Sequence, residues 1–155
     1  MATRKRQRWS PGAIFLIRQS DALWTVGQVL DRMMPNVASC AFYDSRVPTG
    51  EVPHLPLPPN SLVAVASVTR NRLDSGDWKV IGRAPINVDR SLWPNERFRQ
   101  VGWIGAKVHD AAIIEEFLEA LHGLVPWDNW KDPNYLDKFL ISPDKKPANL
   151  VYKHH

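Results

Sequence analysis

The chain has 155 residues, of which 44% are apolar and 23% charged, the size and composition of one ordinary globular domain. It contains no apolar run long enough to cross a membrane and no secretory signal, and its single cysteine, Cys40, excludes an intramolecular disulfide, so we expect a cytoplasmic protein. The net charge of +4 equals that of the basic residues within 1–9, so the rest of the chain sums to zero. A neutral body predicts weaker nucleic-acid binding than the pI of 9.4 suggests.

The two ends of the chain are predicted to lie outside the folded body. Residues 1–9 are polar and basic, with little apolar surface except Trp9, which indicates a disordered and dispensable arm. The paired histidines at 154–155 resemble the remnant of a purification tag. We therefore expect one domain, covering residues 10–153.

Three apolar segments at the start of this domain have the length and composition of β-strands. They are short, rich in β-branched and aromatic residues, and separated by turn signals, which predicts an antiparallel meander. Gly27, inside the second segment, indicates a bulge or a close approach of another group to the backbone. The segments are residues 13–17, 23–30 and 37–43, and the expected core includes Phe15, Ile17, Val26, Val29 and Phe42.

The middle of the chain alternates between loops and short strands. Five prolines in residues 44–60 predict a long extended loop, because proline fits neither a central strand nor a helix interior. Residues 83–100 show no clean periodicity. Strands are expected at 61–69, 78–82 and 101–108, with a turn at 73–77.

One helix is predicted clearly in the last third of the chain. Asp110 is a good N-cap, apolar residues recur at helical spacing as far as Leu121, and Gly123 is a stop signal. Asp132 followed by a proline predicts a second helix, ending near Leu140. The fold class expected is therefore α+β: a twisted antiparallel β-sheet, partly closed like a barrel, with one or two helices packed against it.

Residues suited to catalysis or metal binding are scarce and scattered. His54, His109 and His122 lie far apart in the sequence, and Cys40 has no second cysteine with which to bind a metal. Cys40 lies within an apolar strand, which is typical of a buried small hydrophobe rather than a nucleophile. We therefore expect a non-enzyme with no catalytic residue, no metal site, no cofactor and no small-molecule substrate.

A candidate partner-binding site is suggested by the distribution of acidic residues. Residues 108–144 hold eight acidic and two basic side chains, and they include the predicted helix and the loop that follows it. Carboxylates around an aromatic anchor are a plausible interface, although the glutamates could equally be the solvated face of an amphipathic helix. The candidate residues are Glu115, Glu116, Glu119, Trp127, Asp128 and Trp130. If these do not bind, the interface is expected in the proline-rich loop 44–60 or the basic stretch 70–107.

Several segments together resemble a known protein family. The residues from Pro11 to Ile17, from Trp24 to Leu30 and from Ala41 to Asp44 look like the opening of the immunity protein 26 family. A tryptophan–glycine segment at 76–82 and the residues from Asp132 to Ile141 are also similar to that family. Those bacterial proteins are encoded beside polymorphic or contact-dependent toxins. The resemblance implies stoichiometric binding and neutralisation of a cognate toxin domain, often a nuclease.

The alternative function is nucleic-acid binding through the basic arm. Four charges give weak, sequence-blind affinity at cellular salt, and no helix-turn-helix or zinc motif accompanies them. A solubilising tail explains the arm more simply. The expected partner is therefore a protein, with no membrane involved and with a nucleic acid as the less favoured alternative.

Overall fold

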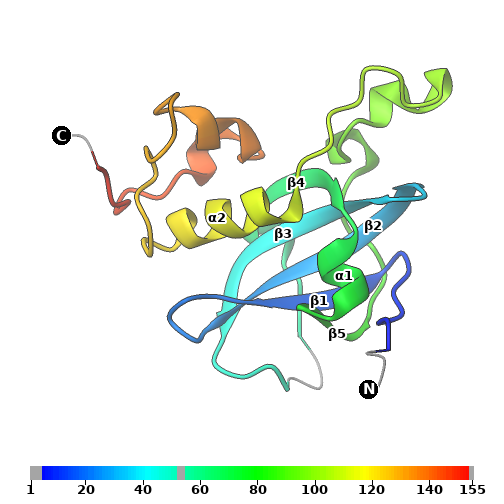
Figure 1. The fold of residues 1–155 in the computed structure, drawn as a ribbon, viewed down its shortest axis with the longest axis horizontal. Coiled ribbons are helices and arrows are strands. Elements are labelled where there is room, and N and C mark those ends of the chain that lie inside the picture. The colour runs from blue at the N-terminus through cyan, green and yellow to red at the C-terminus, as the bar shows by residue number, and fades with distance from the viewer. Residues whose placement is uncertain (1–4, 52–54, 154–155) are drawn as a thin grey trace.

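The protein is built on one five-stranded antiparallel sheet, seen in a computed structural model that describes residues 5–51 and 55–153 (Figure 1). The strand order is β4-β3-β2-β1-β5, so the first three strands form the predicted meander. The expected α+β fold class is confirmed. The strands are β1 (Ala13–Arg18), β2 (Trp24–Met34), β3 (Val37–Val47), β4 (Leu62–Thr69) and β5 (Trp78–Arg83).

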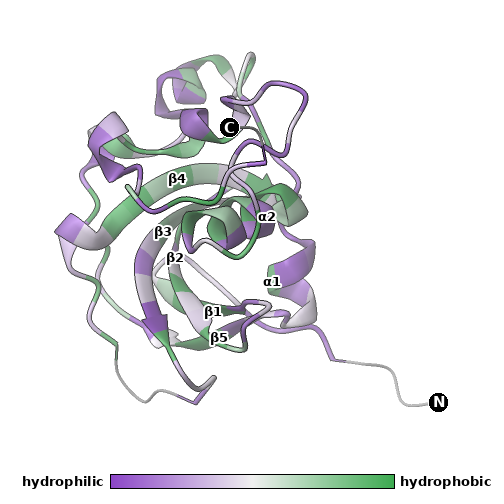
Figure 2. Cartoon of the chain, turned by 90° about the vertical axis from the view of Figure 1, so that its left-hand side faces the viewer, coloured by the Kyte–Doolittle hydropathy of each residue, from purple (hydrophilic) through white to green (hydrophobic). Residues whose placement is uncertain are grey.

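The sheet curls around one helix without closing into a barrel. Figure 2 shows the strands arranged as an arc, with the helix α2 (Ala111–Leu121) inside its concave side. The two edge strands, β4 and β5, do not pair with each other. Glycine at position 27 permits tight packing within this curve, because a Cβ there would lie 2.5 Å from the Phe15 ring. The close approach expected at Gly27 is therefore confirmed.

Both faces of the sheet are covered, so the protein has two cores. On the concave side Phe15 stacks on Trp78 with ring centroids 5.2 Å apart, and α2 adds Phe117 to the same cluster. On the convex side Val26 and Tyr43 lie beneath the segments that follow β3 and β5. All five predicted core residues are buried, but Val26 belongs to the convex core and the other four to the concave one.

The helix α2 begins and ends where the sequence predicted. The Asp110 carboxylate accepts a hydrogen bond from the Ala112 N–H at 2.9 Å, and Gly123 follows the helix with a φ of 74°. The second predicted helix is only a 3₁₀ turn, η4 (Tyr135–Phe139). Its tighter winding places Leu136 and Phe139, three residues apart, on one buried side.

Three other local predictions are corrected by the structure. Residues 101–108 form no strand, because Gly102 and Trp103 adopt positive φ angles and turn the chain. The predicted turn at 73–77 contains most of a short helix, α1 (Asn71–Ser75), which Gly76 ends. The expected loop 44–60 begins later, because β3 continues to Val47. The remaining short 3₁₀ helices are η1 (Pro59–Ser61), η2 (Arg90–Leu92), η3 (Glu96–Val101) and η5 (Pro143–Lys145).

The N-terminal arm is docked over residues 6–9, so the prediction of a disordered segment is wrong there; residues 1–4 lie outside the described residues. Gln7 binds the free edge of β5 with its side-chain amide, donating to the Trp78 carbonyl at 2.8 Å and accepting from the Val80 N–H at 2.9 Å. Trp9 is only 8% exposed, and its Nε1 donates to Asp74 at 2.8 Å. The arm docks because it satisfies an unpaired sheet edge, a requirement that its own composition does not reveal.

Neither described helix is long and apolar enough to span a membrane. The predicted tag remnant at 154–155 lies outside the described residues.

Candidate functional site

The glutamates of the predicted acidic interface are partly committed to contacts within the protein. Glu115 accepts a hydrogen bond from Trp78 Nε1 at 3.1 Å and pairs with Arg72 at 3.2 Å. Glu119 accepts from both the backbone N–H and the hydroxyl of Ser20 at 2.8 Å. All three glutamates, Glu116 included, are half-buried rather than freely exposed. The prediction of an open carboxylate face on α2 is therefore wrong.

The aromatic anchor predicted beside these glutamates is also internal. Trp127 is fully buried, packs on Phe117 and donates from Nε1 to Asp137 at 2.7 Å. Asp128 is 4% exposed and accepts a hydrogen bond from the backbone N–H of Lys153. Trp130 is half-buried. It stacks on Tyr135 with ring centroids 4.5 Å apart. The loop after α2 thus adds Trp127 to the concave core, and an exposed tryptophan ringed by carboxylates does not exist there.

Exposed apolar side chains gather instead on the segment 89–108, which we call the protruding segment. It stands away from the sheet at the upper right of Figure 1. Ile104 is 76% exposed and Val101 54% exposed, the two highest values among the large exposed apolar side chains of the described chain. Exposed apolar side chains that lie close together on one loop are typical of an interaction surface.

An asparagine holds the two ends of this segment together. The Asn95 amide accepts a hydrogen bond from the Lys107 N–H at 3.0 Å and donates to the Lys107 carbonyl at 2.7 Å. Its Nδ2 also donates to the Ser67 hydroxyl on β4 at 2.9 Å. These bonds close the loop 95–107 and attach it to the sheet, so its tip projects from a fixed base.

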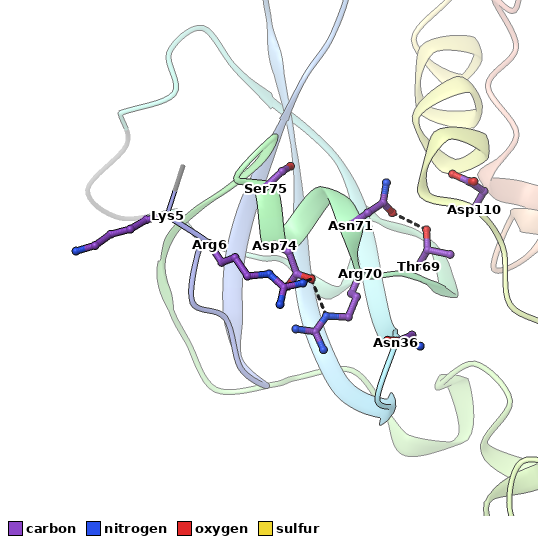
Figure 3. Close-up of a pocket in the computed structure, with 9 residues that line it drawn as sticks. All are labelled: Lys5, Arg6, Asn36, Thr69, Arg70, Asn71, Asp74, Ser75 and Asp110. Atoms are coloured by element: carbon purple, nitrogen blue, oxygen red, sulfur yellow. Dashed lines mark hydrogen bonds and ion pairs between the residues drawn. The ribbon is translucent and has the colours of Figure 1, made fainter. Parts of the chain in front are cut away.

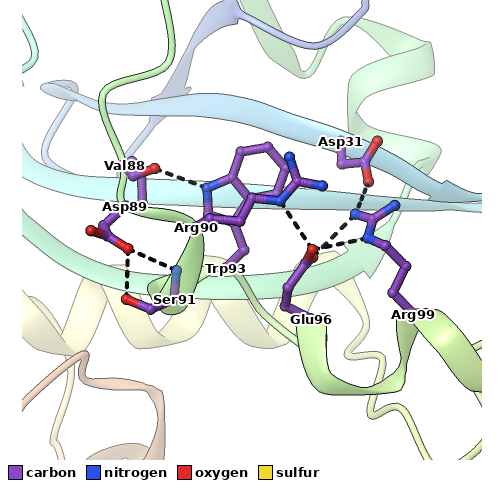
Figure 4. A network of polar contacts seen from close by, with 8 residues as sticks. All are labelled: Asp31, Val88, Asp89, Arg90, Ser91, Trp93, Glu96 and Arg99. Atoms are coloured by element: carbon purple, nitrogen blue, oxygen red, sulfur yellow. Dashed lines mark hydrogen bonds and ion pairs between the residues drawn. The ribbon is translucent and has the colours of Figure 1, made fainter.

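A charged network fixes the same segment to β2 (Figure 4). Arg99 bonds to Glu96 at 2.9 Å and to Asp31 at 2.7 Å, and Arg90 also pairs with Glu96 at 3.0 Å. The hydrogen bond from Arg99 is the main cause that holds the pKa of Glu96 below its usual range, against the opposing effect of burial. The two arginines also lie over aromatic rings, Arg90 over Trp93 and Arg99 over Trp103.

Two residues of the segment adopt left-handed backbone conformations, Asn95 with a φ of 60° and Trp103 with a φ of 66°. Asparagine tolerates this region, whereas a bulky residue such as tryptophan rarely adopts it. The conformation at Trp103 costs on the order of 1–3 kcal/mol and persists only where its surroundings impose it. The strain at Trp103 turns the chain so that Val101 and Ile104 are left in solvent while Trp103 itself is half-buried.

A second surface feature is a strongly basic groove, lined in part by Arg32 of β2 and by Thr69 and Arg70 at the end of β4. Two adjoining cavities, of about 610 and about 570 Å³, share Arg6, Arg70 and Asp74 in their walls. Together they are lined by six basic side chains and by two carboxylates, those of Asp74 and Asp110. We call this surface the arginine groove; its cations are Lys5, Arg6, Arg8, Arg32, Arg70 and Arg83.

Asp74 is the centre that organises the groove (Figure 3). Its carboxylate accepts from Arg70 Nε at 2.7 Å, from Arg6 at 3.0 Å and from the Trp9 indole at 2.8 Å. Burial favours the neutral acid, but these bonds and charges outweigh it and hold the pKa of Asp74 below its usual range. The docked arm thereby adds its charge to that of Arg70 and its neighbours, an arrangement that the composition of the arm did not predict.

The residues considered for catalysis are held in separate places. Cys40 is fully buried, and burial strongly raises the pKa of its thiol. His109 packs against the Phe139 ring, whereas His122 lies 3.4 Å from the Asp44 carbonyl. Burial lowers the pKa of both imidazoles. His54 lies outside the described residues.

Within the described ranges, no group of three or more histidine, cysteine or carboxylate side chains is placed to hold a metal ion. Comparison of the chain with protein-family models, with curated proteins and with solved structures finds no match. Function must therefore be argued from the protruding segment and the arginine groove.

Proposed function

We propose that the protein acts by binding and neutralising a cognate bacterial toxin domain, as the resemblance to the immunity protein 26 family implies, in the cytoplasm and without turnover. The observation that carries this proposal is the protruding segment, an exposed apolar tip on a loop that is already locked. Protein interfaces are centred on such tips when they fill a pocket on the partner.

The locked geometry of the tip favours tight binding. Immobilising a flexible loop on association would cost binding free energy, whereas the bonds of Asn95 and Arg99 fix this loop before a partner arrives. Ile104 and Val101 then bury apolar surface that is now in water. Stoichiometric inhibition requires this kind of preformed, slowly dissociating contact.

The charges around the tip describe the partner surface that would fit it. Arg97 and Lys107 are exposed on the segment, and neither forms an ion pair with another residue in the described part of the chain. A complementary surface would carry carboxylates around an apolar pocket. The phosphate-binding site of a nuclease is basic, so with a nuclease toxin this tip would bind beside the substrate site rather than over it.

The test is co-expression with the toxin domain encoded directly upstream of this protein's gene. The wild-type protein should restore growth and form an equimolar complex that persists at high salt. Ile104→Asp should weaken that complex by about thirtyfold or more, the effect of losing a hot spot of about 2 kcal/mol. Val151→Asp is the matched control, because Val151 is also exposed but lies near the C-terminus.

Two results would contradict the proposal at different levels. Growth inhibition that this protein does not relieve would overturn neutralisation itself. Neutralisation that survives Ile104→Asp with affinity within a factor of two would leave the function standing and remove the protruding segment as its interface.

A further inference from the structure

The arginine groove holds more positive charge than the protein itself neutralises. Arg8 makes no hydrogen bond or ion pair with any described residue, and Arg32 only stacks on the Trp9 ring, 4.1 Å from its centroid. Arg83 donates to the uncharged Pro11 carbonyl at 2.8 Å. Asp74 offsets only one charge of the Arg6–Arg70 pair, so the groove retains a surplus that an anionic ligand can neutralise.

The elements that carry these cations are fixed relative to one another. Arg32 comes from β2, Arg83 from β5, and Arg70 from the residue that precedes α1. Gln7 and Trp9 anchor the arm on both sides of Arg8. The cations thus converge on one surface through tertiary structure, and little ordering is required when a ligand binds.

We propose that the arginine groove is a second binding site, which takes the phosphate backbone of a nucleic acid without reading its sequence. Five of its six cations are arginines, whose planar fork matches the oxygens of a phosphate in pairs. Trp9 is buried beneath Arg32, so its ring is covered and cannot stack on a base. A surface that offers positive charge but no exposed aromatic ring binds the phosphate backbone of a nucleic acid, so its affinity depends on salt and not on sequence.

An acidic protein segment fits this surface less well. An extended peptide commonly binds by adding a strand to a free sheet edge, where backbone hydrogen bonds supply affinity. The adjacent edge is β5, and the Gln7 side chain already occupies its Trp78 carbonyl and Val80 N–H. The groove therefore offers charge contacts but no backbone pairing at this edge.

The experiment measures the affinity of the full-length protein for a short labelled DNA duplex by fluorescence anisotropy, with a second duplex of unrelated sequence alongside. Equal dissociation constants are expected for the two sequences. The logarithm of the association constant should fall linearly with the logarithm of the salt concentration, by about 0.9 for each phosphate neutralised.

The decisive variant is the pair Arg8→Gln with Arg83→Gln, and its control is Arg18→Gln with Lys131→Gln. Both pairs remove two exposed cations, but Arg18 and Lys131 line neither cavity of the groove. The groove pair should reduce the salt slope by about 2, since each removed arginine leaves one phosphate without its cation, and weaken binding about tenfold or more. If the pair affects folding, Arg8→Gln alone replaces it, because this change breaks no bond to a described residue. The single variant should give about half of the slope change.

Three outcomes would overturn this site. If the groove pair and the control pair reduced affinity equally, the duplex would be attracted only by the net charge of the protein. If the wild-type protein did not bind the duplex even at low salt, the groove would not be a nucleic-acid site. Displacement of the duplex by polyglutamate at equal charge concentration would assign the groove to acidic proteins. Because none of these variants changes the protruding segment, toxin neutralisation should survive them, which separates failure here from failure of the proposed function.

Discussion

Two regions of the protein place similar side chains in different environments. One is the helix α2 with the loop after it, and the other is the protruding segment 89–108. Both contain tryptophans and charged residues beside them. After α2 these groups turn inward, where Trp127 fills the concave core and bonds to Asp137. In the protruding segment Arg90 and Arg99 lie over tryptophan rings, and Ile104 is left in water.

The difference shows that contacts across the fold, more than local composition, decide which apolar side chains are exposed. The loop after α2 lies against the concave core and adds Trp127 to it, in contact with Phe117. The protruding segment extends beyond the sheet, so Trp93 packs at the margin of the convex core and under Arg90, while Trp103 lies under Arg99. Its exposed apolar tip is what remains.

The largest effect is expected when the variant Trp127→Ala is compared with Ile104→Ala. Removing the buried ring should lower the free energy of unfolding by about 3–5 kcal/mol, because it leaves a cavity in the concave core. Removing the exposed side chain should change it by no more than about 0.5 kcal/mol. Urea denaturation measures both, and similar values for the two variants would break the comparison.

A second test asks whether the N-terminal arm belongs to the packed part of the protein. Gln7→Ala leaves the Val80 N–H and the Trp78 carbonyl at the β5 edge without their partner, so we expect a loss of about 1–3 kcal/mol. Arg8→Ala, at a neighbouring position without such bonds, is the control and should be close to neutral. If Gln7→Ala left the free energy of unfolding unchanged, the arm would again be interpreted as dispensable.

The third test loosens the protruding segment without touching its tip. Asn95→Gly keeps the backbone free to adopt its positive φ but removes the amide that bonds Lys107 and Ser67. Hydrogen exchange should become faster over 96–106, while the amides of α2 stay protected, and the cost should be about 1 kcal/mol. Uniform acceleration across both regions would mean that the segment is not locked independently.

The smallest expected effect is a loss of stability in mild acid. Burial holds the pKa values of His109 and His122 below the ordinary 6.5. The unfolded chain therefore binds more protons than the folded protein below pH 6.5, and the free energy of unfolding falls as the pH drops through that range. His122→Gln should remove part of this dependence in thermal denaturation curves recorded from neutral pH to about pH 5.5. An unchanged slope would mean that His122 is not the group responsible.

Local chemistry along the chain was enough to predict the main elements. The strands around Phe15, Val26 and Phe42, the close approach at Gly27 and the helix that begins after Asp110 follow from side-chain periodicity and capping, which act over a few residues. The strained turn at Trp103 could not be predicted in this way. Its conformation depends on Asn95, Arg99 and Asp31, the last of which comes from a distant part of the chain.

The sequence by itself determined the meander, its core residues and α2, because periodicity and capping are local properties. Only the tertiary structure decided which surface could bind a partner. The positions of Glu115 and Trp127 depend on Trp78 and Asp137, and the docked arm depends on the free edge of β5. Exposure is set by what lies across the fold, and contacts between residues tens of positions apart leave no periodic signal in one sequence.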